Sequence, residues 1–364
     1  MPIYLDHNAT TPVDPRVLAR FLEIEQSGVA NPASPHGSGR RARAILEAAR
    51  ETIATSLRVV PEDVVFVSGG TEANNLVARG LGDPGLPVLA SAAEHPSLLE
   101  AVGTRGTVEL GIDTTGLVLL TPPPVAVGLL AVVHGQSEVG TIQIVDRARA
   151  CADALAIPLH IDASQTLGRL DLLPAVAAAD TMTLSPHKAG GPRGIGVLLA
   201  KTRALRPLLL GGGQERNLRA GTVSPALAAA AALTIDLAMR EWEQRAVAMR
   251  AARAAFESGL EGLRVRRVTP HDALPNTVML DFEDVRDGRI LLPALDLAGV
   301  EASHGSACSS GSPLPPRILQ AMGLDAAAAR RCVRFSFSHH TTIVAAQEAS
   351  AIVEKVVRRL ASTR

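Results

Sequence analysis

Short apolar runs alternate with helical patterns through the first part of the chain. The runs are rich in Val, Ile and Leu, and each is shorter than a buried helix would be, which favours strands. We therefore expect strands at 64–68, 87–92, 128–134, 158–164, 181–185 and 195–200. Residues 71–80 and 145–156 have the spacing of helices that face a core on one side. This alternation predicts an α/β fold with a mostly parallel central sheet covered by helices.

The pattern changes after about residue 240. A charged helical stretch over 240–260 leads into segments that alternate or are rich in β-formers, at 263–268, 276–282 and 332–338. Helical spacing recurs at 288–298, 315–322 and 342–361. These elements predict a smaller α+β domain, which the N-terminal segment joins. The predicted division is a large domain over 15–245 and a small domain formed by 1–14 and 246–364.

Composition narrows the classes of function. The chain has 364 residues, is 47% hydrophobic and has a formal net charge of +0, which predicts a packed globular protein that binds no nucleic acid directly. Its longest apolar tracts, PPPVAVGLLAVV and PALAAAAALTI, are shorter than the roughly 20 residues that span a membrane. We expect no signal peptide, because MPIYLDHNATTP has no basic region followed by an apolar run.

The cysteines are few and far apart. Cys151, Cys308 and Cys332 form no CxxC spacing, which is typical of a reducing cytoplasm and gives neither a disulfide framework nor a zinc site. His339 and His340 are adjacent, but no further metal-binding motif accompanies them. The sequence therefore predicts a cytoplasmic protein without a metal centre.

Lysine is scarce, since only Lys188, Lys201 and Lys355 occur. Lys188 directly follows an expected strand, in the turn SPHKAGGPRG. Arginine would serve solubility equally well, whereas an amine forms a Schiff base with an aldehyde such as pyridoxal 5′-phosphate. The sequence therefore predicts this cofactor, with Lys188 as its catalytic amine.

Residues at other strand ends match the further demands of that cofactor. A carboxylate must face the ring nitrogen, and Asp162 lies at the end of an expected strand; Gln165 follows it as a partner for the phenolic oxygen. The phosphate needs backbone N–H groups at a helix N-terminus and hydroxyl groups. The candidates for the phosphate are Gly70, Thr71, Ser185 and His187, and His95 is a planar candidate for stacking on the ring. Each residue alone is ordinary turn or capping chemistry, and only their joint occurrence points to the cofactor.

Ten motifs carry a resemblance to a known family. They are YLDHNATTPVDPRV, NPASPHG, VFVSGGTEANN, EHPS, SEVGTIQ, HIDASQT, SPHKAGGPRGIG, GGGQERNLRAGT, SHGSACSSGS and VRFSFS. In this order and nearly end to end, the chain resembles the cysteine desulfurases of the NifS/IscS type, within the class V aminotransferase-like family. The resemblance implies the fold-type I transferase fold of pyridoxal-phosphate enzymes and a homodimer with shared sites.

The resemblance also implies a role for each matched residue. His95 would stack on the cofactor and assist proton transfer, and Asp162 and Gln165 would face the ring nitrogen and the ring oxygen. Thr71, Ser185 and His187 would hold the phosphate, and Thr222 would reach the phosphate of the neighbouring subunit. Arg334 would clamp the substrate carboxylate, as its bidentate geometry favours, with Asn31 nearby.

Cys308 matches the nucleophile of that family. L-cysteine would be converted to L-alanine while the Cys308 thiolate takes the sulfur as a persulfide, which requires an ionised thiol. The sulfur would then pass to an acceptor protein for iron–sulfur assembly, tRNA thiolation or a biosynthetic pathway. The Gly/Ser/Pro-rich residues around Cys308 suit a mobile loop, whereas Cys151 and Cys332 lie in apolar contexts typical of structural cysteines.

One departure from the family pattern leaves alternatives open. The family usually has Asn-Asn where this chain has Gln136 and Ser137, so Gln136 would contact the cofactor with a longer reach, or the substrate differs. A class V aminotransferase, or a cysteine or selenocysteine lyase, is therefore the second hypothesis. A non-catalytic scaffold of a sulfur-transfer system is the third, and the joint presence of Lys188, Asp162, His95 and Cys308 argues against it.

Overall fold

The computed structural model describes residues 2–28, 30–202, 204–286, 288–305 and 316–362. The helices are α1 (Pro15–Gln26), α2 (Gly37–Leu57), α3 (Gly70–Gly80), α4 (Pro96–Leu99), α5 (Val145–Ala154), α6 (Leu173–Ala178), α7 (Pro225–Ser258), α8 (Leu291–Leu297), α9 (Arg317–Ala321), α10 (Ala326–Arg331) and α11 (Ile343–Ser362). The strands are β1 (Ile3–Tyr4), β2 (Val64–Val67), β3 (Val88–Ser91), β4 (Thr107–Leu110), β5 (Leu129–Val133), β6 (Leu159–Asp162), β7 (Thr181–Leu184), β8 (Gly196–Ala200), β9 (Val265–Arg267), β10 (Thr277–Phe282), β11 (Val300–Glu301) and β12 (Cys332–Ser336).

The larger region is built on a seven-stranded sheet with the order β2-β8-β7-β6-β5-β3-β4. β8 runs antiparallel to both of its neighbours, and the other pairings are parallel. The predicted mostly parallel sheet is thus confirmed, and each strand expected between residues 64 and 200 is present. β4 was not expected, because its TVEL sequence is polar and lies at the exposed edge of the sheet.

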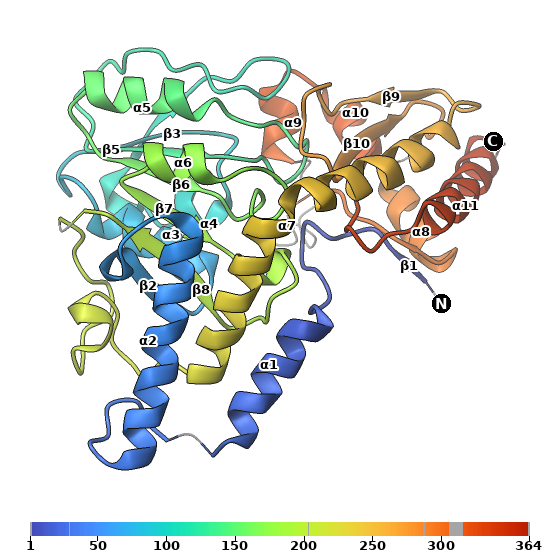
Figure 1. Cartoon of the computed structure of the whole chain (residues 1–364). Helices are drawn as coiled ribbons and strands as arrows, with labels where there is room; N and C mark the ends of the chain where they lie inside the picture. The colour runs from blue at the N-terminus through green and yellow to red at the C-terminus, as the bar shows by residue number, and fades with distance from the viewer. Residues whose placement is uncertain (1, 29, 203, 287, 306–315, 363–364) are drawn as a thin grey trace.

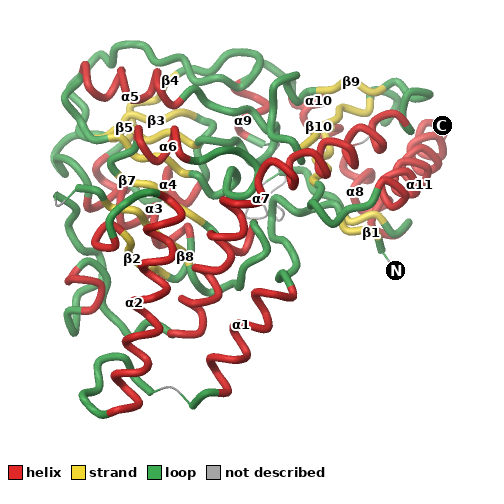
Figure 2. Tube along the Cα trace, viewed as in Figure 1, coloured by secondary structure: helices red, strands yellow, loops and turns green. Residues whose placement is uncertain are grey.

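Helices cover both faces of this sheet, as the alternation along the chain predicts (Figures 1 and 2). Phe66 and Ile161 pack on one face with α2, α5, α6 and α7. Val65 and Ala131 pack on the other with α3 and α4. Because neighbouring residues of a strand point to opposite faces, buried strands of this kind are apolar throughout.

The smaller region contains the antiparallel sheet β12-β10-β9 and the parallel pair β1-β11. Figure 1 shows both chain ends in this region. Its core contains Leu5 from the N-terminal segment together with Phe256, Phe282 and Phe335. The strands and helices predicted after residue 260 are present, with ends shifted by a few residues. The helix predicted over 240–260 is the second part of a longer helix that begins at Pro225.

The long helix α7 joins the two regions (Figure 1). Its alanine-rich first half packs in the core of the large sheet through residues such as Ala231 and Ala238, and its last turns pack in the small core through Ala252 and Phe256. The helix continues because no Gly or Pro interrupts it after Pro225. We therefore propose that the domain boundary between residues 245 and 246 lies within this one helix, and that it separates the part packed on the large core from the part packed on the small core. No helix of the described residues is long and apolar enough to cross a membrane.

Candidate active site

The parallel strands of the large sheet end at one edge, and a cavity of about 210 Å³ lies there. Among its lining residues are Gly70, Thr71, His95, Asp162, Gln165, Ser185, His187, Lys188 and Arg334, all of which the sequence proposed. They come from the ends of β2, β3, β6 and β7 and, in the case of Arg334, from β12 of the small region. Asn8, Asn74, Ser97, Ser137 and Ser164 also line it.

Lys188 lies in a short 3₁₀ turn, Pro186–Lys188, directly after β7. The N-terminal segment buttresses this turn, since the Thr11 N–H donates to the His187 carbonyl at 3.0 Å. The His187 ring lies beside the Thr10 hydroxyl, with 3.1 Å between Nδ1 and Oγ1. Burial and the neighbouring charge of Lys188 lower the pKa of His187 to about 4, so the ring is neutral at physiological pH.

The N-terminus of α3 opens on the same cavity. Gly69 precedes the helix and supplies no side-chain cap, so the first N–H groups of α3 are available to an anion. Ser164 and Ser185 add two hydroxyl groups, with their oxygen atoms 2.9 Å apart. A Cβ atom at Gly70 would collide with the Ser185 Oγ atom. Glycine at position 70 therefore keeps this end of the cavity open.

Asp162 ends β6 and is 4% exposed. Burial opposes its ionisation, but hydrogen bonds from Ser164 and Asn74 and the charge of Lys188 hold the pKa of Asp162 below its usual value. The two donated bonds are 2.9 Å from the Ser164 N–H and 2.8 Å from the Asn74 amide. The site thus offers a buried, ionised carboxylate at the base of the sheet edge.

His95 stands at the N-terminus of α4, in the turn that follows β3. Its Nδ1 atom accepts the backbone N–H of Ser97 at 3.0 Å. Burial, and then the charge of Lys188, lower the pKa of His95, while Asp162 acts in the opposite direction. Its neighbour Glu94 is buried, and burial raises the pKa of that carboxyl well above its usual value. The imidazole on the cavity wall is therefore neutral.

Gln165 is held by residues that the sequence analysis missed. Its Nε2 atom donates to the Asn8 carbonyl at 2.9 Å, and its Oε1 atom accepts from Arg169. Arg169 also donates to the Asn8 side chain and the Lys188 carbonyl. Burial and the charge of Arg334 lower the pKa of Arg169 to about 9. The only signal in the sequence was the spacing of four residues between Gln165 and Arg169, which places them on one side of a helical turn.

Arg334 reaches the cavity from the small region. It donates to Asp6 at 2.5 Å and to the Ser137 carbonyl at 2.9 Å. Gln136, proposed as a cofactor ligand, does not line this cavity. Its Oε1 atom instead accepts the N–H groups of Glu138 and Val139, at 2.6 and 2.8 Å. In this turn residue 137 lines the cavity, and the side chain of residue 136 closes the turn.

Asn31 and Thr222 lie together, but elsewhere. They line a second cavity of about 460 Å³, which also contains the buried ion pair of Arg50 and Glu215. Asn31, proposed near Arg334, does not line the cavity that Arg334 lines. Asn31 Oδ1 accepts the Ala33 N–H at 2.9 Å and so shapes its own turn.

The cysteines differ sharply in their surroundings. Cys308 lies outside the described residues. Cys332 is buried on β12, and burial together with the charge of Asp281 raises the pKa of its thiol to about 12. Burial also raises the pKa of the half-buried Cys151 on α5. Neither of these two thiols is a thiolate at neutral pH.

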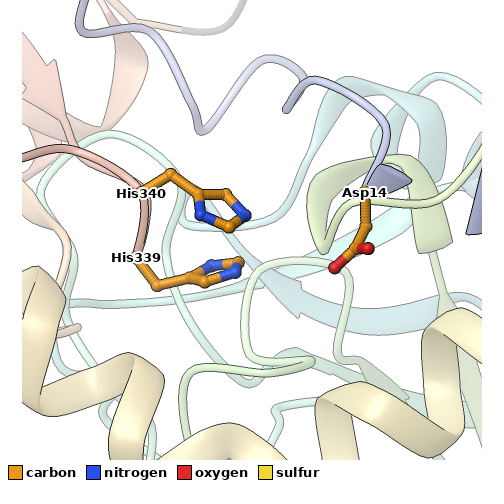
Figure 3. A group of neighbouring side chains, drawn as sticks. All are labelled: Asp14, His339 and His340. Atoms are coloured by element: carbon orange, nitrogen blue, oxygen red, sulfur yellow. The ribbon is translucent and has the colours of Figure 1, made fainter. Parts of the chain in front are cut away.

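Figure 3 shows one group of side chains of metal-binding type, Asp14, His339 and His340, within the described residues. The two imidazole rings lie 3.9 Å apart between centroids, with nitrogen atoms turned toward Asp14. Both oxygen atoms of that carboxylate already accept hydrogen bonds from Arg16, at 3.0 and 2.8 Å. Because Arg16 neutralises the carboxylate, we assign no metal ion to this group.

Comparison with known proteins agrees with the geometry of the site. The model of the aminotransferase class-V family matches residues 3–347. An IscS-like cysteine desulfurase of Mycobacterium tuberculosis is 32% identical over 360 residues, which cover 92% of this chain and 91% of the relative. The solved structure of a NifS-like protein has a TM-score of 0.89 and 29% identity, covering 99% of this chain and 100% of the other. SspA in complex with cysteine has a TM-score of 0.80 and 29% identity, covering 92% and 98% of the two chains.

The family model spans almost the whole chain, and the relatives match over nearly their full length. The chain belongs to the aminotransferase class-V family, whose fold is the α/β architecture described above. Within that family it belongs with the cysteine desulfurases of the NifS/IscS type.

Proposed function

We propose that this chain is a pyridoxal-phosphate-dependent cysteine desulfurase, which converts L-cysteine to L-alanine and takes up the sulfur on Cys308. The observation that carries the proposal is the cavity at the sheet edge. Lys188, the ionised Asp162 and the neutral His95 all line this one cavity. Its relatives by sequence are named cysteine desulfurases, which selects this reaction among those of the family.

The donors of the cavity fit pyridoxal phosphate. The open N-terminus of α3, with the Ser164 and Ser185 hydroxyl groups, suits a phosphate. Asp162 suits the protonated ring nitrogen, and the Lys188 amine suits the aldehyde carbon. When bound, the cofactor supplies an electron sink for the carbon atoms of the substrate.

The residues of the chain then bind the substrate and hold its protons. Arg334, buried and oriented by Asp6 and the Ser137 carbonyl, binds the carboxylate of L-cysteine through its planar guanidinium group. His95 presents its ring to the reacting atoms, and Lys188 carries protons to and from them with its amine. The Arg169 network keeps the Lys188 turn and Gln165 in place.

Cys308 is the proposed acceptor of sulfur. Its thiolate attacks the sulfur of the substrate, an S–S bond forms and the carbon–sulfur bond breaks. The electron pair of that bond remains with the carbon side, which takes up a proton and leaves as alanine. The raised pKa values of Cys151 and Cys332 support the choice of Cys308 among the three cysteines.

Two variants test the proposal in the purified protein. Cys308→Ala should abolish the formation of sulfide from L-cysteine with dithiothreitol, and it should leave the visible absorption of the bound cofactor unchanged. Sulfide release undiminished in Cys308→Ala would exclude the persulfide step. Keto-acid production in place of alanine would indicate an aminotransferase or a lyase.

Lys188→Ala tests the amine. The variant should lose the visible absorption band that an amine-linked cofactor gives. Lys201→Ala is the matched control, because the Lys201 amine donates only to carbonyl groups at the end of α6 in the described contacts. An unchanged spectrum in Lys188→Ala would contradict the assignment of the catalytic lysine.

We further propose that the enzyme acts as a homodimer in the cytoplasm and delivers sulfur to an acceptor protein. Asn31 and Thr222 support the dimer, since they line a cavity apart from Lys188 and a second copy of the chain would bring them to that site. Sedimentation of the purified chain at twice its mass of 37.9 kDa is the expected result.

A further inference from the structure

The first turn of α4 determines which nitrogen of His95 carries the proton. His95 is the N-cap of this helix, and its Nδ1 atom accepts the Ser97 backbone N–H at 3.0 Å. A ring nitrogen that accepts a hydrogen bond carries no proton, so a neutral histidine in this position is protonated on Nε2. Nε2 is therefore the ring nitrogen that His95 offers to the cavity it lines.

The Ser97 hydroxyl reinforces this arrangement. Its oxygen lies 2.8 Å from His95 Nδ1 and 2.9 Å from the Asn74 Nδ2 atom. An amide nitrogen can only donate, so Ser97 Oγ accepts from Asn74 and directs its own hydrogen to His95 Nδ1. The imidazole nitrogen then accepts two hydrogen bonds, and adding a proton to it would displace both donors.

The orientation of the Asn74 amide is determined by a charge. Its Nδ2 atom donates to Asp162 Oδ2 at 2.8 Å, and an ionised carboxylate is only an acceptor. On its other side, Asn74 Oδ1 accepts from the Thr183 hydroxyl at 2.8 Å and lies 3.3 Å from His160 Nε2. Three of the four hydrogen-bonding positions of the amide are thus filled by Asp162, Ser97 and Thr183, and a flipped amide would place its oxygen against the Asp162 carboxylate.

We propose that Asn74 is a positioning residue, which holds His95 through Ser97 as the neutral imidazole protonated on Nε2 and orients Asp162 with the same amide. The inference rests on the proposed function, in which His95 and Asp162 face one cofactor. His95 is faced by the positive charge of Lys188 from the turn after β7 and by the carboxylate of Asp162 at the end of β6. The Asn74 amide links Asp162 to Ser97, and it passes no proton between them because an amide does not titrate.

This arrangement specifies what His95 can do in the reaction. A neutral imidazole at a helix N-terminus can polarise a bound group by donating a hydrogen bond. Here the Nε2–H is the one hydrogen-bond donor that the neutral ring can offer to a bound group, and Nε2 takes up no proton until its own has left. Asp162 keeps its charge because the Asn74 donor and the Lys188 charge favour the ionised form.

The test is the titration of His95 in the full chain labelled with ¹⁵N-histidine and freed of cofactor. The His95→Gln spectrum identifies the signal. We expect the ¹⁵N shifts of an unprotonated Nδ1 and a protonated Nε2 at neutral pH. Ser97→Ala should raise the midpoint of the His95 titration by about one pH unit, the worth of one hydrogen bond, and Ser97→Thr should restore it.

Asn74→Asp provides the second arm, with Asn75→Asp as the matched control. A carboxylate at 74 accepts the Ser97 hydrogen and stands against Asp162, so the His95 midpoint should rise further. Asn75 donates only to the carbonyl groups of Thr71 and Ser97 in the described contacts, and its replacement should move the midpoint less. A protonated Nδ1 in the native chain, an unchanged midpoint in Ser97→Ala, or equal shifts at 74 and 75 would overturn the proposal. A failure to bind cofactor would contradict the proposed function and leave this titration unaffected.

Discussion

At the scale of single residues, Arg334 depends on the partners that surround its guanidinium group. Arg334 is 1% exposed, and a charge this deeply buried is stable only with partners. Asp6 and the Ser137 carbonyl orient its Nη atoms, while Nε is buried and makes no hydrogen bond to the described residues. The guanidinium group is therefore fixed in orientation and can still donate to a further acceptor. In the proposed function this acceptor is the carboxylate of the substrate.

Arg334→Lys should raise the KM for L-cysteine by about 10- to 100-fold, with a smaller change in kcat, because lysine cannot form the planar pair of hydrogen bonds. The measurement is alanine formation as a function of L-cysteine concentration. Arg331→Lys is the control, since Arg331 pairs with Asp281 instead. An equal rise of KM in both variants would contradict the assigned role.

The side chain of Gln136 is engaged by its own turn and not by the cavity. The Oε1 atom of its side chain closes this turn by accepting hydrogen bonds from the N–H groups of residues 138 and 139. Gln136→Ala should lower the free energy of unfolding by about 1–3 kcal/mol, because it leaves two buried donors unsatisfied. The folded variant should retain its cofactor absorption, and loss of that absorption at full stability would restore Gln136 as a cofactor ligand. Urea unfolding and the visible spectrum provide the two measurements.

At the scale of elements, α7 connects the two cores. It begins at the Ser224 cap, whose hydroxyl accepts the Leu227 N–H at 3.3 Å, and Pro225 follows in its first turn. Such a start is favourable because the first N–H groups of a helix have no partners within the helix. The charged second half continues the helix, with an ion pair between Asp236 and Arg240. One helix thereby positions β12, and Arg334 on it, relative to the large sheet.

Ser224→Ala should lower the free energy of unfolding by about 1 kcal/mol, and Ser224→Asp should recover most of that loss. Ser258→Ala is a matched control, because the Ser258 hydroxyl donates to the Ala255 carbonyl within the last turn and caps no N–H group. Chemical unfolding at constant pH is the measurement. An equal loss in the two alanine variants would contradict the capping role of Ser224.

At the scale of the whole molecule, several histidines are buried in the neutral form. Burial is the largest cause that lowers the pKa of His7, His134, His160 and His187 to about 4 and that of His339 to about 3. The unfolded chain takes up these protons near pH 6.5, before the folded chain does. Their contribution to stability is therefore complete above pH 6.5 and is lost as the pH falls toward 4.

The free energy of unfolding should fall by several kcal/mol between pH 7 and pH 5, since each such histidine contributes up to about 2 kcal/mol over that interval. Urea unfolding at a series of pH values measures it. His160→Gln should reduce the fall, and His271→Gln, at a site where the side chain is 95% exposed, should not. Constant stability from pH 7 to pH 5 would show that folding does not lower the pKa values of these histidines.

The pattern of residues along the chain by itself predicted most strands of the large sheet and several residues of the site. Apolar runs located the strands between residues 64 and 200 except β4. The residues at the ends of these strands included Lys188, Asp162 and His95, which meet because the strands of a parallel sheet end at one edge. The motifs also indicated the family. These features depend on neighbours along the chain, where side-chain period and turn chemistry act directly.

The tertiary structure decided what each side chain faces. The links from Asn8 to Gln165 and Arg169 join residues more than 150 positions apart, and the chain from Asp162 through Asn74 and Ser97 to His95 joins the ends of different strands. Gln136 turned from the cavity, and Asn31 and Thr222 came together in another one. Hydrogen-bond partners of this kind are chosen by packing between distant segments, which the order of residues along the chain does not contain.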